Sequence, residues 1–389
     1  MNGTGSRTRV IILASTLVTG GAEAIVQAIA LGMPGRGIDP TLVCLRAPGE
    51  IGERLAGAGI PVRAGLRGRG WGGGALMRLV ALLRVRRDAV LLCLDHHDSI
   101  ALGVAAARIA GLPGRILAVH STGLWGRSGS FSRSDRLSLG GFSRVVAVAD
   151  SHRDYLVRKE GIRGDRIVVI HNGVDIKRFR PPSAEERQRA RWDLRLETDS
   201  YVAVIVAALR PEKNHEMLLR AAARLRREDP RFVLLIAGEG KQAGDLRELA
   251  GVLGLGDAVR FLGRRTDIPA VLAAADVSVL CSHPVVETFP LSLLESMACA
   301  LPVVATSVGS IPEMIEHGRE GILIPAGDED ALTAAVAGLG GEPRRRGELG
   351  ARARMRVEER YSEDLMIDSY ARLLGGLDPS KGDSSGIAC

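Results

Sequence analysis

The chain is poor in aromatic residues and lacks several patterns that identify other classes of protein. Only 3% of its 389 residues are Phe, Trp or Tyr, so Leu, Val, Ala and Ile are expected to form the core. It has no run of about 18 apolar residues, which argues against a membrane-spanning helix. The short polar segment before the first apolar run does not resemble a signal peptide. These absences favour a cytoplasmic protein.

The cysteines are few and have no metal-binding or redox spacing. Their number is odd and no CxxC pair occurs: Cys44, Cys93, Cys281, Cys299 and Cys389. Most lie in apolar segments, which predicts buried, reduced thiols rather than disulfides or a metal site.

Charge is unevenly distributed along the chain. Residues 1–180 contain 26 Lys and Arg against 13 Asp and Glu, whereas the remainder contains 26 against 32. A basic first half indicates an anionic ligand or surface, such as a lipid diphosphate or a membrane. No recognised nucleic-acid motif appears, so nucleic acid is not an expected partner. The alternative explanation of the basic first half is that its arginines serve only solubility.

Apolar strand-like runs alternate with helical patterns along the whole chain. The runs are near-continuous in Val, Ile and Leu, which predicts sheets covered on both faces. The expected strands lie at 10–14, 41–45, 89–94, 115–119, 144–149, 167–170, 201–207, 232–237, 258–261, 276–280, 302–305 and 321–324. A polar, proline-bearing segment at 171–182 separates two such series. We expect an α/β fold of two doubly wound domains facing each other across a cleft.

The domain boundaries follow from the linker and from the helical end of the chain. The prediction assigns 1–178 to the first domain, 179–360 to the second, 361–376 to a helix that crosses back to the first, and 377–389 to a flexible tail.

The most informative segment is Glu287-Thr288-Phe289-Pro290-Leu291-Ser292-Leu293-Leu294-Glu295. It follows an expected strand and enters a helix, and Pro290 suits the first helical position. Backbone amides at the start of a helix bind anions such as a diphosphate. Flanking carboxylates accept hydrogen bonds from sugar hydroxyls, so the segment suits a nucleotide-sugar. On spacing alone, two surface glutamates are the simpler interpretation.

Weaker candidates follow other expected strands. Gly20 and Gly21 form a glycine turn before a helix, which allows a phosphate to approach. His120 ends a strand, where an imidazole can contact a sugar hydroxyl or a reacting group. Lys213 and Arg210 can neutralise a diphosphate. Four other histidines are expected at the surface: His96, His97, His152 and His283.

Taken together, these segments resemble the retaining glycosyltransferases of the GT-B fold, specifically glycosyltransferase family 4. The resemblance runs from Val10 to about Leu374, and Glu287 to Glu295 resembles the EX7E element of the family. The segment 171–175, which reads HNGVD, is similar to the interdomain segment of the family.

The resemblance implies roles for particular residues. It makes His120 and Glu287 the catalytic candidates, with Glu287 on the donor sugar and Glu295 on the ribose. The implied donor-binding residues are Gly20, Gly21, Arg210, Lys213, Glu287, Thr288, Phe289, Pro290, Leu291 and Glu295. Where the family usually has arginine this chain has Ala208, and Arg210 is the expected substitute.

The implied reaction moves a sugar from a nucleotide-sugar to an acceptor with retention, and needs no metal or other cofactor. No DxD motif lies at the donor site, since Asp328-Glu329-Asp330 is typical of a helix start. The expected acceptor is a sugar or a lipid-linked molecule in cell-surface polysaccharide or glycolipid assembly, with peripheral association at the inner membrane face. The alternatives are a nucleotide-sugar 2-epimerase and a catalytically idle nucleotide-sugar-binding subunit.

Overall fold

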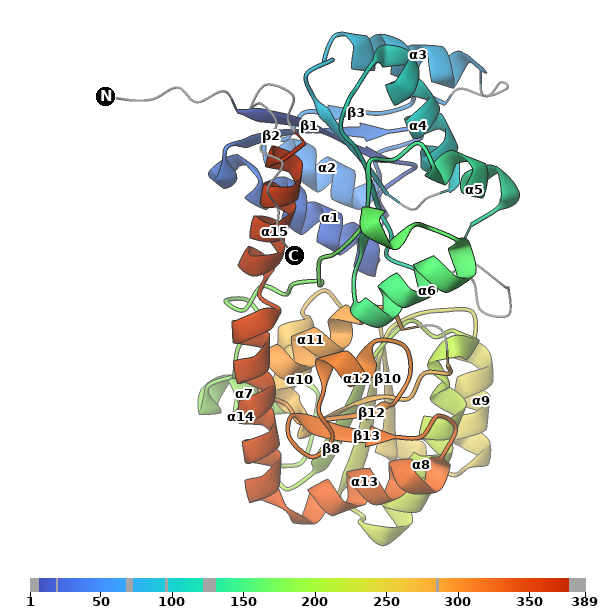
Figure 1. Ribbon diagram of the computed structural model, residues 1–389. Coiled ribbons are helices and arrows are strands. Elements are labelled where there is room, and N and C mark those ends of the chain that lie inside the picture. The colour runs from blue at the N-terminus through green and yellow to red at the C-terminus, as the bar shows by residue number, and fades with distance from the viewer. Residues whose placement is uncertain are drawn as a thin grey trace. The chain divides into compact units, whose positions relative to one another are not determined.

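The computed structural model describes residues 7–18, 20–67, 73–94, 97–121, 131–284 and 287–377. The chain forms two compact units (Figure 1). The N-terminal unit comprises Met1–Gly173 and Glu363–Cys389, and the C-terminal unit comprises Val174–Ser362. The chain therefore passes from one unit to the other within the HNGVD segment and returns after Ser362. The predicted tail lies almost wholly outside the described residues.

A parallel sheet in the order β3-β2-β1-β4-β5-β6-β7 forms the centre of the N-terminal unit. Its strands are β1 (Thr8–Ala14), β2 (Ile38–Cys44), β3 (Val62–Arg63), β4 (Val90–Leu94), β5 (Arg115–Ala118), β6 (Arg144–Ala147) and β7 (Ile167–Val169). Its helices are α1 (Gly21–Gly32), α2 (Gly49–Gly57), α3 (Gly73–Arg84), α4 (His97–Ala110), α5 (Arg133–Leu139), α6 (Asp150–Glu160) and α15 (Glu363–Gly375), with short 3₁₀ turns η1 (Pro34–Arg36) and η2 (Gly164–Arg166).

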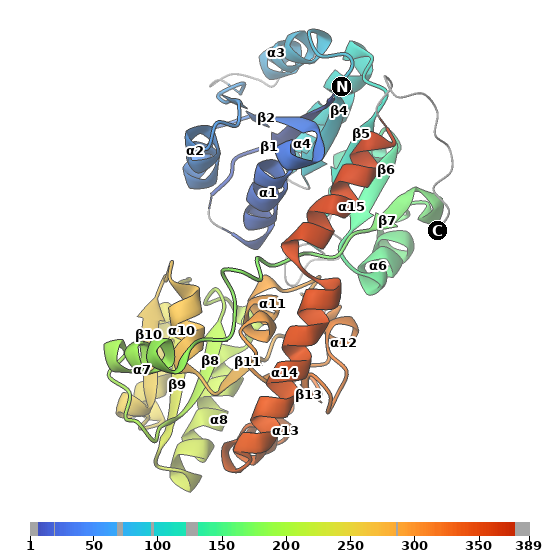
Figure 2. The ribbon, with the colours of Figure 1, turned by 90° about the vertical axis from the view of Figure 1, so that its left-hand side faces the viewer.

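Helices cover both faces of this sheet. On one face α3, α4 and α5 pack together over alternate strand side chains, Ile11 and Leu13 among them. On the other face α15 lies next to α1 (Figure 2). A Cβ atom at Gly32 of α1 would lie 2.4 Å from Ile367 of α15, so glycine allows the two helices to approach closely. Helix α15 is thereby a structural part of the N-terminal unit.

The C-terminal unit has a parallel sheet in the order β10-β9-β8-β11-β12-β13. Its strands are β8 (Tyr201–Val206), β9 (Phe232–Ala237), β10 (Val259–Gly263), β11 (Val277–Leu280), β12 (Val303–Thr306) and β13 (Gly321–Ile324). Its helices are α7 (Ala184–Asp193), α8 (His215–Glu228), α9 (Ala243–Val252), α10 (Ile268–Ala274), α11 (Leu291–Ala298), α12 (Ile311–Met314), α13 (Glu329–Gly341) and α14 (Pro343–Arg360), with 3₁₀ turns η3 (Pro211–Lys213) and η4 (Gly256–Ala258).

The predicted pair of doubly wound α/β domains is confirmed. The apolar runs form buried parallel strands, and helices lie between successive strands in both units. The prediction missed β3, which has only two residues and lies at the edge of its sheet. The four described cysteines are buried, as predicted, whereas Cys389 lies outside the described residues. None of the described helices is both long enough and apolar enough to cross a membrane.

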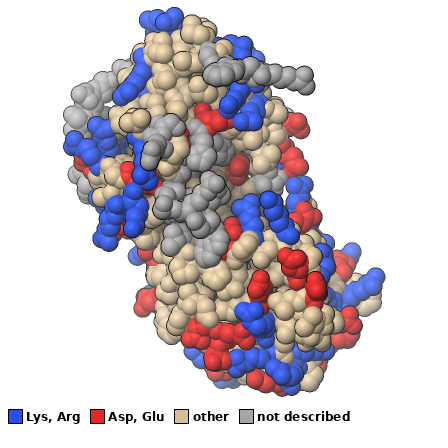
Figure 3. Space-filling model, turned by 90° about the vertical axis from the view of Figure 1, so that its right-hand side faces the viewer, with Lys and Arg blue, Asp and Glu red and all other residues tan. Residues whose placement is uncertain are grey.

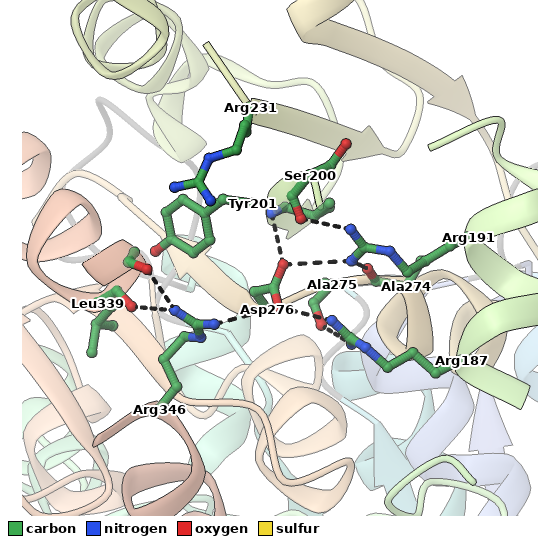
Figure 4. Close-up of polar contacts among 12 residues, drawn as sticks. Arg187, Arg191, Ser200, Tyr201, Arg231, Ala274, Ala275, Asp276, Leu339 and Arg346 are labelled. Atoms are coloured by element: carbon green, nitrogen blue, oxygen red, sulfur yellow. Dashed lines mark hydrogen bonds and ion pairs between the residues drawn. The ribbon is translucent and has the colours of Figure 1, made fainter. Parts of the chain in front are cut away.

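A half-buried carboxylate just before β11, that of Asp276, joins several segments of the C-terminal unit. Asp276 accepts hydrogen bonds from the Val202 amide and from Arg187, each at 2.8 Å (Figure 4). Arg191 and Arg346 lie 3.5 and 4.0 Å from the same carboxylate. These guanidiniums also donate to backbone carbonyls at the end of α10 and within α13. One negative charge therefore holds three arginines that connect helices to the sheet.

We expect Asp276→Asn to lower the free energy of unfolding by about 3 kcal/mol, because it leaves three partly buried guanidiniums without a counter-charge. Urea denaturation checks this value. Asp193→Asn is the matched control, since Asp193 pairs with Arg189 at an exposed position and is worth at most about 0.5 kcal/mol. Equal small losses in the two variants would contradict the structural role of Asp276.

Candidate functional site

The loops that follow β8, β11 and β12 meet at one edge of the sheet in the C-terminal unit. These strands are parallel neighbours, so their carboxyl ends lie side by side. The first loop holds Lys213, the second Glu287 and the third Gly309. Ligands of open α/β sheets bind at this edge.

Glu287 and Lys213 form an ion pair that is largely withdrawn from solvent. The ammonium Nζ of Lys213 lies 2.5 Å from Oε1 of Glu287. The Glu287 side chain is 5% exposed and that of Lys213 is 20% exposed. Ser282, which follows β11, donates its hydroxyl proton to the same carboxylate oxygen. The structure thus joins two predicted donor-binding residues that are far apart in the sequence.

The backbone of Glu287 is fixed by the loop that follows β12. The amide of Ser310 donates to the Glu287 carbonyl at 3.0 Å. Gly309 has a φ of +56°, and a Cβ atom at this position would lie 1.9 Å from the same carbonyl oxygen. Any side chain at Gly309 would push the two loops apart, so the close approach depends on glycine.

Helix α11 starts one residue later than the sequence predicts. Pro290 has an extended ψ of 119° and is the N-cap residue, so the prediction that it is the first helical residue is wrong. Its carbonyl accepts from the amides of Leu293 and Leu294 at 3.2 and 3.4 Å. Within the described ranges no acceptor is recorded for the amides of Leu291 and Ser292. Two donors at the start of α11 therefore remain for an anion.

The two residues between Glu287 and Pro290 differ in their surroundings. Phe289 is 2% exposed, and its ring meets that of Tyr361 edge to face with centroids 5.2 Å apart. Its side chain belongs to the core, so only its backbone can serve a ligand. Thr288 is half-buried.

Glu295 lies half-buried in α11. Burial raises the pKa of its carboxyl to about 7, although the nearby charge of Arg178 acts in the opposite direction. Arg354 of α14 holds this helix in place by donating to the Ala298 carbonyl at 2.8 Å and to the Phe179 carbonyl at 2.7 Å. Sequence reasoning missed Arg354, because nothing local marks a side chain that joins segments so distant in the chain.

Arg210 begins the turn that ends at Lys213. Its side chain is 66% exposed, and the nearest described carboxylate is that of Glu212 at 3.8 Å. Nearby, a Cβ atom at Gly238 would lie 1.9 Å from the carbonyl oxygen of Ala207. The loop after β9 therefore packs directly on the backbone that leads to Arg210. The expected substitution of Arg210 for a family arginine stays a prediction.

The predicted residues of the N-terminal unit lie at the carboxyl edge of its own sheet. Gly20 is the N-cap residue of α1 and Gly21 is the first residue of that helix, after β1. His120 is half-buried and lies just after β5. Because β1 and β5 both pair with β4, these residues occupy the same edge.

A charged cluster that sequence reasoning missed lies at this edge too. The carboxylate of Asp98, at the start of α4, is 2.7 Å from Arg46 and also contacts Arg67. Burial alone would raise the pKa of Asp98, but hydrogen bonds from both arginines outweigh it and lower the pKa. The three residues follow three different strands, so only the tertiary structure assembles them.

Two groups outside these edges have structural roles. His152 is 3% exposed and its Nδ1 accepts from the Val148 amide at 3.2 Å, so the predicted surface position is wrong. The imidazole is buried because it satisfies a backbone donor after β6. Asp328 caps α13 by accepting from Ala331 at 2.8 Å, which confirms the predicted helix start.

Comparison with known families matches both halves of the chain. The family described as "Glycosyl transferases group 1" matches residues 186–356, and "Glycosyltransferase Family 4" matches residues 19–178. The chain is 36% identical over 241 residues to a D-inositol 3-phosphate glycosyltransferase of Saccharomonospora viridis, covering 58% of this chain and 55% of the relative. It is 37% identical over 253 residues to the enzyme of that name from Thermomonospora curvata, covering 61% and 57%. The chain thus spans little more than half the length of these curated relatives.

Solved structures resemble the chain over nearly its whole length. Anabaena HepE, in complex with UDP and glucose, has a TM-score of 0.84 at 23% identity and covers 95% of this chain and 100% of its own. WaaG, a glycosyltransferase involved in lipopolysaccharide biosynthesis, has a TM-score of 0.73 at 15% identity, covering 94% and 100%. At such identities the likeness shows the fold, which is the GT-B fold.

The raised pKa of Glu295 predicts that its contribution to stability changes with pH. The folded state keeps the proton up to about pH 7, whereas the unfolded carboxyl releases it near 4.5. Because the folded state binds more protons in this interval, stability falls as the pH rises through it. The free energy of unfolding of Glu295→Gln, relative to that of wild type, is therefore expected to rise by up to about 3 kcal/mol between about pH 5 and about pH 8.

Urea denaturation at the two pH values measures this difference. Glu216→Gln, at an exposed position of α8, is the control and should follow wild type at both. A Glu295→Gln variant that parallels wild type across the interval would contradict the raised pKa.

Proposed function

The chain belongs to the group 1 glycosyltransferases, glycosyltransferase family 4, and on this premise we propose that it transfers a sugar from a nucleotide-sugar to an acceptor hydroxyl with retention of anomeric configuration. The observation that carries the proposal is the buried ion pair of Lys213 and Glu287 beside the amino end of α11. The ammonium and the amides at the helix start can bind a diphosphate, and the carboxylate can accept hydrogen bonds from sugar hydroxyls. These are the groups of a nucleotide-sugar.

Each group has a part in donor binding. The diphosphate lies against the amides of Leu291 and Ser292 and draws the ammonium of Lys213 towards it. The carboxylate of Glu287 accepts hydrogen bonds from sugar hydroxyls. Glu295, farther along α11, accepts a hydrogen bond from the ribose in this proposal. The donor is a nucleoside diphosphate sugar, and UDP is the first nucleotide to test because HepE was solved with it.

In the transfer step the bond between the anomeric carbon and the diphosphate oxygen breaks, and the electron pair leaves with the nucleoside diphosphate. The acceptor oxygen forms its bond to the same carbon on the same face. Its proton passes to a leaving-phosphate oxygen. Lys213 and the α11 amides stabilise the charge on the diphosphate, a preorganised electrostatic role that needs no metal ion.

The acceptor carries a negative charge in this proposal. Arg46 and Arg67 lie at the carboxyl edge of the N-terminal sheet, and the curated relatives are named for D-inositol 3-phosphate. An anionic group competes with Asp98 for the two guanidiniums. A phosphorylated sugar and a lipid-linked phosphate share this chemistry.

Transfer activity tests the donor site. A thermal-shift screen with UDP-glucose, UDP-N-acetylglucosamine and GDP-mannose identifies the donor, since a bound donor raises the unfolding temperature. With that donor, Glu287→Gln and Lys213→Ala are each expected to lower kcat/KM about 100-fold or more. Proton NMR of the product is expected to show the donor's anomeric configuration, with turnover that persists in EDTA.

Glu248→Gln, at an exposed position of α9, is the matched control and should turn over normally. Circular dichroism shows whether the variants fold. Near-normal turnover in folded Glu287→Gln or Lys213→Ala removes the donor-site assignment, and conversion of the nucleotide-sugar to an epimer without any acceptor favours the epimerase.

We propose further that the N-terminal unit binds an anionic membrane surface peripherally. Figure 3 shows basic side chains in patches on this unit, whereas acidic and basic side chains lie interleaved on the C-terminal unit. Helices α3, α4 and α5 adjoin one another. Their exposed apolar side chains lie close in sequence to several arginines: Val85 just after α3, Ile109 in α4 and Leu137 in α5. Apolar groups set among basic ones suit an anionic lipid interface.

Vesicle sedimentation tests this surface. Binding to phosphatidylglycerol vesicles is expected to weaken severalfold when the salt concentration rises from about 0.05 M to about 0.5 M, because salt screens the attraction. Leu137→Asp should weaken binding further. Val252→Asp, an equally exposed position in the C-terminal unit, should leave it unchanged. Binding that is insensitive to salt would contradict the proposal.

A further inference from the structure

Both side-chain contacts of Glu287 fall on one carboxylate oxygen. Lys213 and Ser282 each donate to Oε1, and no group in the described part of the chain donates to Oε2. A sugar hydroxyl can therefore be accepted by Oε2 while Oε1 stays engaged. The orientation of the carboxylate then depends on what holds Oε1.

The two donors to Oε1 differ in rigidity. The ammonium of Lys213 sits on a flexible four-carbon stem and takes many positions. Ser282 is 0% exposed and its side chain has a single rotatable bond to the hydroxyl carbon. Once a diphosphate draws Lys213 away, Ser282 is the donor that still fixes Glu287.

The short segment after β11 is anchored on both sides of this contact. The thiol of Cys281 lies 3.4 and 3.3 Å from the carbonyls of Lys213 and Asn214. The amide of His283 donates to the Glu212 carbonyl at 2.9 Å. Three successive residues, 281–283, thus connect the loop after β8 to Glu287.

The backbone of Ser282 is held from the neighbouring strand as well. Thr306, the last residue of β12, donates its hydroxyl proton to the Ser282 carbonyl at 2.8 Å. The hydroxyl of Ser282 is therefore positioned by β8, β11 and β12 together, the three strands whose loops form the site.

We propose that Ser282 is a positioning residue for the donor sugar. Its hydroxyl holds Oε1 of Glu287 so that Oε2 faces the sugar hydroxyls when Lys213 has turned to the diphosphate. The proposal rests on the donor site described under the proposed function. It assigns Ser282 to recognition of the sugar and not of the nucleotide.

The first test compares a nucleotide-sugar with its free nucleoside diphosphate. UDP-glucose with UDP, and GDP-mannose with GDP, are the probe pairs, and the pair that wild type binds is used. Ser282→Ala is expected to lower kcat/KM for the nucleotide-sugar about tenfold, the loss of one hydrogen bond to a charged group. The Kd of the free nucleoside diphosphate, measured by calorimetry, should stay within about twofold of wild type.

Ser278→Ala is the matched control. Ser278 is a buried serine of β11 that accepts a hydrogen bond from Ser296 at 2.8 Å and has no contact with Glu287. Its loss should leave kcat/KM unchanged. Ser282→Thr keeps the hydroxyl and should recover part of the activity. Equal weakening of nucleotide-sugar and nucleoside diphosphate by Ser282→Ala would overturn the assignment to the sugar.

The second test needs no ligand and separates this inference from the proposed function. Ser282→Ala is expected to lower the unfolding midpoint in the wild-type background but not in a Glu287→Ala background, where its partner is missing. Equal losses in both backgrounds would overturn the contact itself. If the two substitutions are coupled but the wild-type protein binds no nucleotide-sugar, the contact is confirmed and the donor site is refuted.

Discussion

The contact between Lys213 and Glu287 is the interaction on which the rest of the site depends. Removing two charges from water costs more free energy than their attraction returns unless the geometry is good and further hydrogen bonds satisfy the remaining atoms. Here the carboxylate of Glu287 accepts hydrogen bonds from an ammonium and a hydroxyl, and the backbone carbonyl of the same residue accepts one from an amide. The proposed function assigns this pair to donor binding, since a ligand can share both of its charges.

The parallel sheet explains why these groups meet. Strands β8, β11 and β12 end at the same edge, so residues that are distant in the chain come from adjacent loops. Close approach of those loops requires Gly309, because any side chain there would strike the Glu287 backbone. Helix α11 then adds its amino end to the same edge, which supplies a positive pole without another charged residue.

Other buried charges of the C-terminal unit serve the fold. The guanidiniums around Asp276 and that of Arg354 donate chiefly to backbone carbonyls at helix ends. The hydrogen bonds recorded for them are made within the protein. Those around Asp276 connect α7 and α14 to the sheet, and Arg354 connects α14 to α11. Lys213 differs because its only recorded side-chain partner among the described residues is a carboxylate that a ligand can share. Among these buried and partly buried groups, the recorded partners distinguish the arginines that support the fold from Lys213.

The sequence by itself determined the α/β architecture, since continuous apolar runs become strands buried on both faces, and punctuated helical patterns return the chain between parallel neighbours. It also made Glu287 a candidate and predicted the helix start that follows it, because those signals are local. The sequence wrongly predicted Pro290 as the first residue of α11, because the change from extended to helical backbone depends on the loop geometry. It also wrongly predicted His152 at the surface.

Only the tertiary structure decided which of these residues meet. Neither Ser282 nor Gly309 is marked by its neighbours in the chain, and each acts through a contact made across strands. The cluster of Arg46, Arg67 and Asp98 likewise draws on two loops and the start of α4. The pKa of Glu295 depends on burial, which follows from packing and not from position in the sequence. Local patterns specify elements, whereas the chemistry of a site depends on distances that only the folded chain sets.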